Sequence, residues 1–291
     1  MASEAFFLPA ADGDGDGDGD GDGARFCVYH APDVGPARAA LLYLHPFTEE
    51  MNKSRRMAAL QSRALAAAGC AVLQIDLHGC GDSSGDFSEA TWASWLDDVR
   101  LARGWLQART DIDAPFWFWG LRAGCLLAVD AAAQFAEPAN FLFWQPVISG
   151  KQLLQQFLRL KAAGEMLGGG SDGVAGVAGV DGSRRQLAEG KVVDIAGYGL
   201  APALAAGLEG AELVLPAQAG RVEWLEMSAK LEPALLPVSQ RRIEQWQTAG
   251  HAVHARAVSG PSFWMTTEIA ESTALLEATV AAITATGGNP T

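Results

Sequence analysis

Residues 117–127 read WFWGLRAGCLL, an aromatic and apolar run that enters a Gly-x-x-x-Gly turn and continues into a second apolar run. This pattern predicts a buried strand that turns tightly into a helix, as at a nucleophile elbow. The centre of an elbow normally carries serine, but here it carries Arg122. Because a guanidinium has no hydroxyl or thiol, we expect Arg122 to do something other than attack a carbonyl.

Apolar runs of strand length alternate with helical patterns on both sides of this turn. The expected strands are 40–45, 70–79, 115–120, 140–146, 221–227 and 251–258, and the expected helices are 49–69, 91–109, 121–136, 238–250 and 266–285. Short apolar strands separated by such helices indicate right-handed βαβ units. We therefore predict an α/β fold with a mostly parallel sheet covered by helices on both faces.

The alternation of strand and helix patterns is interrupted in the middle of the chain. We divide the sequence into a first part of the core (1–148), an insertion (149–212) and a second part of the core (213–291). Residues 168–182 contain little besides glycine and small residues, so we expect a low-complexity loop there. An insertion at this point of the fold is interpreted as a lid.

The DG repeat at 12–23 lies between two short strand patterns and predicts a hairpin with an enlarged loop. Calcium binding is the alternative, but the repeat lacks the spaced ligands and terminal glutamate of an EF-hand. The four cysteines show no metal-binding spacing, so we expect reduced thiols, no metal site and no cofactor.

Composition limits the partners and the location. The formal net charge of -13 and the absence of a basic stripe argue against nucleic acid. The amino terminus lacks the basic and apolar regions of a signal peptide, and no uncharged run approaches the length of a membrane span. We therefore expect a cytoplasmic protein.

Six strings carry a more specific resemblance: HPFTEEMNKSRRM, DLHGCGDSSGDF, WGLRAG, FWQPVISGKQLLQQFLRLK, DIAGYGL and GPSFW. With them the chain resembles the exosortase A system-associated hydrolase 2 family, and almost its whole length resembles the α/β-hydrolase fold. The resemblance implies hydrolase ancestry and a link to exopolysaccharide and protein-sorting systems, including a possible protein partner there.

The catalytic triad of that fold runs nucleophile, acid, histidine along the chain. The acid is expected after the strand 221–227, and the candidates are Glu226 at the end of that strand and Glu232 further along. Gln145 stands at the alternative acid position. After the last strand, Phe263 and Trp264 stand where the histidine is required. Two of the three roles are thus vacant, which is typical of a pseudoenzyme.

Histidines and a cysteine elsewhere do not repair the triad. His251 and His254 begin the last strand, roughly 15 to 20 Å from its active end. Cys125 follows the elbow on the next helix, where we expect its thiol to be buried against the sheet.

Polar and aromatic residues still collect at the carboxyl ends of the expected strands, the edge at which open α/β sheets bind ligands. The candidate ligand-binding residues are Arg122, His45, Glu49, Glu50, Asn52, Trp144, Gln145 and Trp264. Each also has a structural interpretation: the glutamates favour a helix N-terminus, the histidine can be hydrogen-bonded, and the tryptophans can belong to the core.

Arg122 itself has two interpretations. It can bind an anion beside the N-terminus of the following helix, or it can pair with Glu49 or Glu50 and fill the vacated catalytic space.

Three functions remain open. The first is a noncatalytic protein that binds an anionic small molecule. The second is an active ester or thioester hydrolase that uses His45 with nearby Glu49 or Glu50 in place of a triad. The third is a noncatalytic interaction protein.

Overall fold

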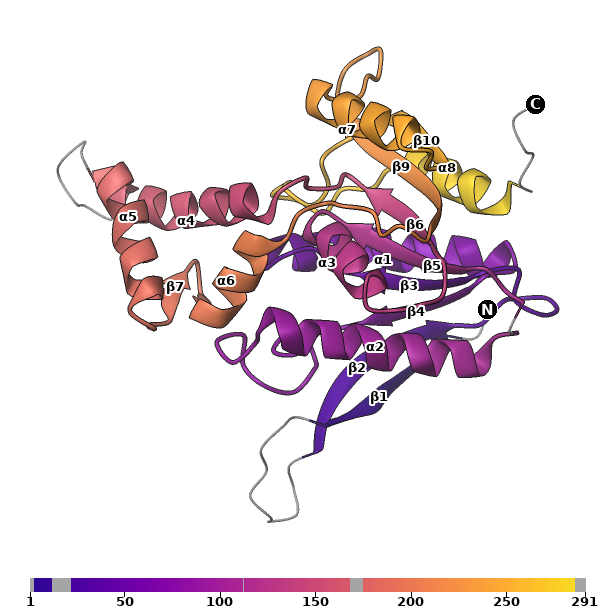
Figure 1. The fold of residues 1–291 in the computed structure, drawn as a ribbon, viewed down its shortest axis with the longest axis horizontal. Helices are drawn as coiled ribbons and strands as arrows, with labels where there is room; N and C mark the ends of the chain where they lie inside the picture. Colours follow the sequence, from indigo (N-terminus) through magenta and orange to yellow (C-terminus); the bar gives the residue numbers. More distant parts are fainter. Residues whose placement is uncertain (1–2, 12–21, 112, 168–174, 286–291) are drawn as a thin grey trace.

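The computed structural model describes residues 3–11, 22–111, 113–167 and 175–285. Its centre is an eight-stranded sheet in the order β1-β2-β4-β3-β5-β6-β9-β10 (Figure 1). The strands are β1 (Ser3–Ala11), β2 (Asp22–His30), β3 (Ala40–Leu44), β4 (Ala71–Ile75), β5 (Phe116–Leu121), β6 (Ala139–Trp144), β9 (Ala219–Ser228) and β10 (Val253–Ser259). The strands from β4 to β10 are parallel, whereas β1 and β2 form an antiparallel hairpin that joins β4 antiparallel.

Helices cover both faces of this sheet because successive side chains of a strand point to opposite faces. Leu41 and Tyr43 of β3 face α1 (Glu49–Ala67) and α8 (Thr273–Thr284), while Leu42 and Leu44 face the opposite layer. That layer contains α2 (Trp92–Arg109), α3 (Ala123–Ala132) and α7 (Pro237–Thr248). The predicted α/β architecture, with helices on both faces, is confirmed.

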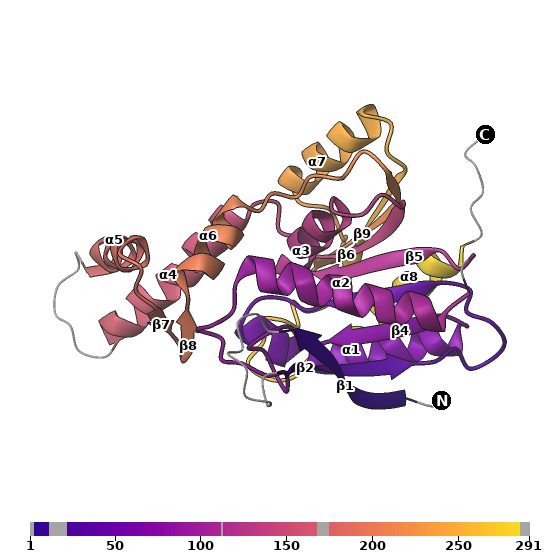
Figure 2. The same ribbon diagram turned by 60° about the horizontal axis from the view of Figure 1, so that its bottom comes forward.

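The insertion between β6 and β9 contains α4 (Gly150–Leu167), α5 (Ala175–Ala188), β7 (Val193–Ile195), β8 (Tyr198–Leu200) and α6 (Pro202–Gly210). Figures 1 and 2 show it extending sideways from the sheet. Gly207 of α6 lies against Trp92 of α2, so closely that a Cβ at Gly207 would lie 2.2 Å from the Cβ of Trp92. The position of the insertion brings β8 toward the N-terminus of α1.

Two expectations about element bounds were wrong. A helix starts at Ala175, so the loop expected over 168–182 does not extend through its second half, and 168–174 lie outside the described residues. The last helix starts at Thr273 instead of 266, because the Ser272 side chain caps it by accepting a hydrogen bond from the Leu275 amide. The predicted hairpin is confirmed by the pairing of β1 with β2, but 12–21 of its DG loop are not described.

In the described part of the chain, no helix has the length and apolar character needed to cross a membrane. The same residues contain no group of three or more histidine, cysteine, aspartate or glutamate side chains arranged to hold a metal ion.

Candidate functional site

The turn between β5 and α3 has the backbone of an elbow. Arg122 stands between the two elements with φ 55° and ψ −114°, a conformation that costs a non-glycine residue about 1 to 3 kcal/mol. The glycines on either side allow the close approach that this turn needs. A side chain at Gly124 would collide with the Leu44 carbonyl oxygen, and one at Gly120 would lie 2.6 Å from the Cys125 nitrogen. The expected strained turn is present although the serine is not.

The side chain held by this turn forms an ion pair with Glu50, in the first turn of α1. Arg122 donates from Nε to Oε1 and Oε2 at 3.2 and 3.4 Å, and from Nη2 to Oε1 at 3.1 Å. The side chains remain 16% and 19% exposed. Burial raises the pKa of Glu50, and the Arg122 charge and hydrogen bonds offset only part of that rise. Glu50 therefore holds its negative charge less readily than a carboxylate in water.

One edge of the Arg122 guanidinium is unused by Glu50. Within the described ranges, no hydrogen-bond acceptor is recorded for Arg122 Nη1. The guanidinium carbon lies 5.8 Å from the ring centre of Trp264, within the range of a cation–π contact. Trp264 is 3% exposed, and its buried Nε1 has no hydrogen-bond partner in the part of the chain that the structure describes. Glu50 and Trp264 thus contact the arginine, and no acceptor among the described residues bonds to its Nη1.

Next to this pair, the insertion meets α1 through Tyr198. The Tyr198 hydroxyl donates to Glu49 Oε2 at 3.2 Å and accepts from Asn52 Nδ2 at 3.1 Å. Burial and the Glu49 carboxylate raise the pKa of Tyr198 to about 12, so the phenol keeps its proton at neutral pH. Tyr198 was not among the predicted site residues. Its only signal was the string DIAGYGL, because a contact across 149 positions is not visible in the sequence.

His45 lies at the end of β3 as predicted, but both ring nitrogens are engaged. Nδ1 donates to the Pro46 carbonyl at 2.8 Å, and Nε2 accepts from the Leu77 amide at 3.3 Å. Burial lowers the pKa of His45, only partly opposed by nearby Asp76, so the ring is neutral. In this arrangement His45 has no lone pair left for a water molecule. It is a buried structural histidine, and the interpretation of His45 as a base is not supported by the geometry.

Two further candidates make contacts within the sheet and its helix layer. The Trp144 indole is 1% exposed and donates to Thr279 Oγ1 of α8 at 3.0 Å. Gln145 has φ 44°, and its side chain accepts from the Met227 amide at 2.7 Å. Trp144 therefore belongs to the core beneath α8, and Gln145 joins the carboxyl ends of β6 and β9. The burial of Trp144 leaves no surface for a ligand to stack on, whereas the ligand role of Gln145 stays a prediction.

The position expected for a catalytic acid is also used structurally. Glu226 is 1% exposed and accepts hydrogen bonds from Trp224 Nε1 at 3.3 Å and from the Leu236 amide at 2.6 Å. It lies within β9, which continues to Ser228, and it holds the start of the segment that leads into α7. Glu232, the alternative acid, is exposed.

The histidine position contains aromatic rings. Phe263 is fully buried after β10, and Trp264 lies beside it. His254 is near the start of β10, where its Nδ1 lies 2.9 Å from Glu223 Oε1. His254 is therefore at the opposite end of the strand from the position that a catalytic base would occupy.

Cys125 is unsuited to replace the missing serine. Its thiol is buried and donates to the Gly120 carbonyl at 3.2 Å. Burial raises the pKa of Cys125 well above its ordinary value, so the reactive thiolate is suppressed. The other three cysteines are likewise free and buried, as expected.

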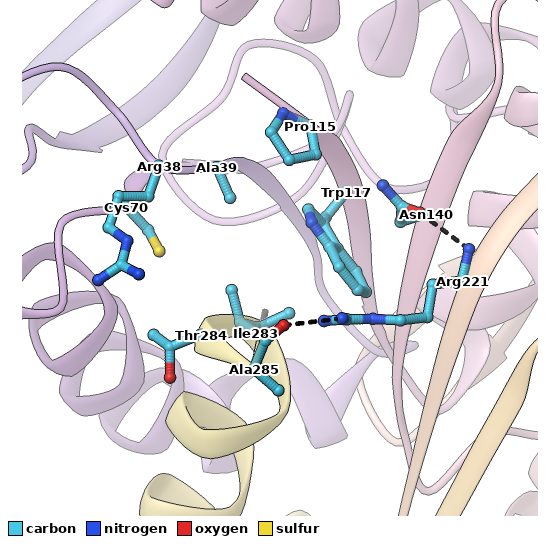
Figure 3. A pocket seen from close by; sticks show the side chains of 10 residues that line it. All are labelled: Arg38, Ala39, Cys70, Pro115, Trp117, Asn140, Arg221, Ile283, Thr284 and Ala285. Carbon is cyan, nitrogen blue, oxygen red and sulfur yellow. Dashed lines mark hydrogen bonds between the residues drawn. The ribbon is translucent and has the colours of Figure 1, made fainter. Parts of the chain in front are cut away.

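A separate cavity of about 280 Å³ lies at the opposite, amino edge of the sheet. Figure 3 shows Trp117 and Arg221 on one side of it and Arg38 on the other. The Arg221 guanidinium donates to the carbonyl oxygens of Ala282 and Ala285, at the end of α8. Arg221 thus fixes the helix terminus, and the cavity is not part of the site at Arg122.

Comparison with known proteins gave similarity at the level of structure. No family model matches the chain, and no curated protein matches it either. The chain is similar in structure to the Butyrivibrio proteoclasticus protein Est1E, which was solved with ferulic acid bound. The TM-score is 0.60 at 16% identity, and the match covers 91% of this chain and 94% of that chain. A thermostable carboxyl esterase from Bacillus coagulans gives a TM-score of 0.56 with 14% identity, covering 89% and 91%. An α/β serine hydrolase without a lid from Xanthomonas campestris gives 0.52 with 16% identity, covering 97% and 92%.

The chain therefore has the α/β-hydrolase fold, as the sequence predicted. Identities this low establish the fold alone, so the chemistry has to be argued from the residues of the site.

Proposed function

We propose that this protein is an α/β-hydrolase-fold protein without serine-type catalysis, which binds a small anionic molecule through Arg122. The observation that carries the proposal is the elbow itself. The strained turn and both close-approach glycines remain, and they direct an arginine where a hydrolase directs its nucleophile. A backbone penalty of this kind is usually found where the geometry serves a function.

The arginine has the properties of an anion-binding group. It is always charged, it is partly exposed, and its Nη1 edge is not used by any described acceptor. It also precedes the first turn of α3, and the N-terminus of a helix favours negative charge. A carboxylate or phosphate oxygen at this edge would therefore meet a cation and a helix N-terminus together.

The surrounding residues argue against hydrolysis. His45 and Cys125 are both engaged and buried, and Phe263 and Trp264 occupy the position of the triad histidine. A serine-type or cysteine-type mechanism requires a base within hydrogen-bond reach of the nucleophile. We therefore favour binding over an unusual hydrolase reaction.

The resemblance to the exosortase A system-associated family supports a more specific version. In that setting, the anion would be an acyl, phosphate or sugar-acid intermediate of exopolysaccharide metabolism. The insertion would act as a lid over the ligand, with Tyr198 as its contact to α1 through Glu49 and Asn52.

The test is a titration of the protein with acetate and with inorganic phosphate. It is observed by NMR at the arginine Nε resonances and, so that variants at position 122 can be compared, at the backbone amides of Ala123 and Gly124. We expect both anions to shift the Arg122 Nε resonance and these two amides, and we expect Arg122→Ala to abolish the amide shifts while the protein stays folded. Arg122→Lys keeps the charge but loses the planar donor pair, so it should bind more weakly than the native protein. Arg56→Lys is the matched control. Arg56 is an exposed arginine on the same helix as Glu50, and it is paired with Glu271.

Equal responses at Arg56 and Arg122, or unchanged binding by Arg122→Ala, would refute the proposal.

A further inference from the structure

The arginine site already contains a carboxylate of the protein. Glu50 uses the Nε and Nη2 side of the Arg122 guanidinium through three contacts of 3.1 to 3.4 Å. A ligand on the Nη1 side would bring a second negative charge close to Glu50. Two carboxylates that share one guanidinium repel each other, and a protonated carboxyl relieves that repulsion. Glu50 should therefore decide how strongly the site attracts an anion.

Other charged groups near Glu50 have partners or lie further along the helix. On α1, Glu49 is engaged by Tyr198 and Asn52, and Lys53 follows one turn later. The loop before α8 contributes the uncharged ring of Trp264 beside Arg122. Arg122 from the start of α3 is therefore the charge that acts directly on the Glu50 carboxylate.

Towards α8, the nearest ion pair on the same helix is Arg56 with Glu271, almost two turns beyond Glu50. The pair of Arg55 with Asp76 turns toward β4 and is complete in itself. Neither of these two ion pairs contacts the Glu50 carboxylate.

We propose that an anion binds to Arg122 together with a proton, which Glu50 accepts, so that Glu50 sets the affinity of the site and its dependence on pH. This inference rests on the function proposed above. The proton comes from solvent, and it converts Glu50 from an acceptor-only carboxylate to a neutral carboxyl that keeps one oxygen toward Arg122. No covalent bond is formed or broken in this step.

The direction of the pH dependence follows from the burial of the pair. Burial already raises the pKa of Glu50, and a bound anion raises it further. Affinity is therefore highest where Glu50 is protonated in the free protein. It falls as the pH rises from the pKa of Glu50 in the free protein to the higher pKa in the complex.

Glu50→Gln tests this directly because glutamine keeps a hydrogen-bond acceptor for Arg122 and removes the charge. Acetate is the probe, and its dissociation constant is measured from the Arg122 Nε shift between pH 5.5 and 8. We expect Glu50→Gln to bind acetate about tenfold more tightly than the native protein at pH 7.5, with little change across the pH range. Glu271→Gln is the matched control, since it removes one negative charge from the same helix layer without touching Arg122.

A second measurement needs no substitution. The titration of the Glu50 side-chain carboxyl carbon is followed by NMR with and without saturating acetate. Acetate should move its midpoint to higher pH.

The outcomes separate the two proposals. If acetate binds at Arg122 but Glu50→Gln binds no better and the Glu50 midpoint does not move, the proton-coupled model is wrong and the arginine site stands. If Glu271→Gln tightens binding as much as Glu50→Gln, the effect is one of net charge, and the model is also wrong. If acetate produces no response that depends on Arg122, the proposed function itself fails.

Discussion

Arg25 of β2 and Asp98 of α2 form an ion pair inside the protein, with Nε 2.6 Å from Oδ1 and both side chains 2% exposed. Asp98 Oδ2 also accepts from the His78 amide at 2.7 Å. The pair joins the amino-terminal hairpin to the helix layer and to the loop after β4. Burial makes the ionisation of Asp98 less favourable than that of a carboxylate in water.

We predict that Asp98 makes stability depend on pH in acid. Burial raises its pKa to about 6, although Arg25 and the His78 amide oppose the rise. Because the folded protein holds this proton more tightly than the unfolded chain, the contribution of Asp98 is fully present below the unfolded pKa and is lost as the pH rises toward 6. Urea unfolding at several pH values should show the stability advantage of the native protein over Asp98→Asn shrinking between about pH 4 and 6. An advantage that grows over this range would mean that Arg25 favours the ionised form more than burial opposes it.

The elbow predicts an unusual order of stability at position 122. In most positions glycine is less stable than alanine, but a φ of 55° reverses this preference. We expect Arg122→Gly to be more stable than Arg122→Ala by about 1 kcal/mol in urea unfolding. The Ala variant measures loss of the Glu50 pair, and the difference between the two variants measures strain. Equal stabilities would show that the turn relaxes once the ion pair is removed.

The close approach at Gly124 predicts a large effect from one methyl group. A Cβ at this position would collide with the Leu44 carbonyl oxygen, so Gly124→Ala should lower the free energy of unfolding by about 3 kcal/mol or more. Gly104 of α2 is the control, since a Cβ there meets no atom within 4 Å. Gly104→Ala should stabilise the protein by about 0.5 to 1 kcal/mol. Thermal or chemical unfolding of the two variants tests both the expected loss of stability in Gly124→Ala and the expected gain in Gly104→Ala.

Restoring serine should not restore an esterase. Arg122→Ser places a hydroxyl on the elbow, but Phe263 and Trp264 still occupy the position of the general base. We expect no turnover of p-nitrophenyl acetate above the buffer rate and no labelling by a fluorophosphonate probe. Clear turnover by this single variant would place a base near the elbow after all.

The parts of the fold that the sequence predicted well are those determined by local patterns. The strand, the glycine spacing and the apolar helix around Arg122 gave the elbow because each depends on neighbouring residues. The face taken by Trp144 was not predictable in this way. A central strand is apolar on both faces, so its pattern does not tell which side chains point toward α8.

Polar partners were the least predictable. The pairing of Arg122 with Glu50 was one of two open interpretations, because it depends on where α1 begins relative to the elbow. Glu226 was a candidate acid at the end of its strand, but β9 continues to Ser228 and its side chain is buried in contacts with Trp224 and Leu236. Tyr198 reaches the site from the insertion, whose packing against the core no periodicity reveals.

The elbow also bears on how such a protein can change its chemistry. The strain of the turn lies in the backbone at position 122, so it accompanies a non-glycine residue there whatever the chemistry of its side chain. The same backbone turn can therefore present different side chains at position 122. One substitution can therefore exchange the group displayed there while the surrounding fold keeps its shape, so that proteins with different chemistry at this turn can share one scaffold.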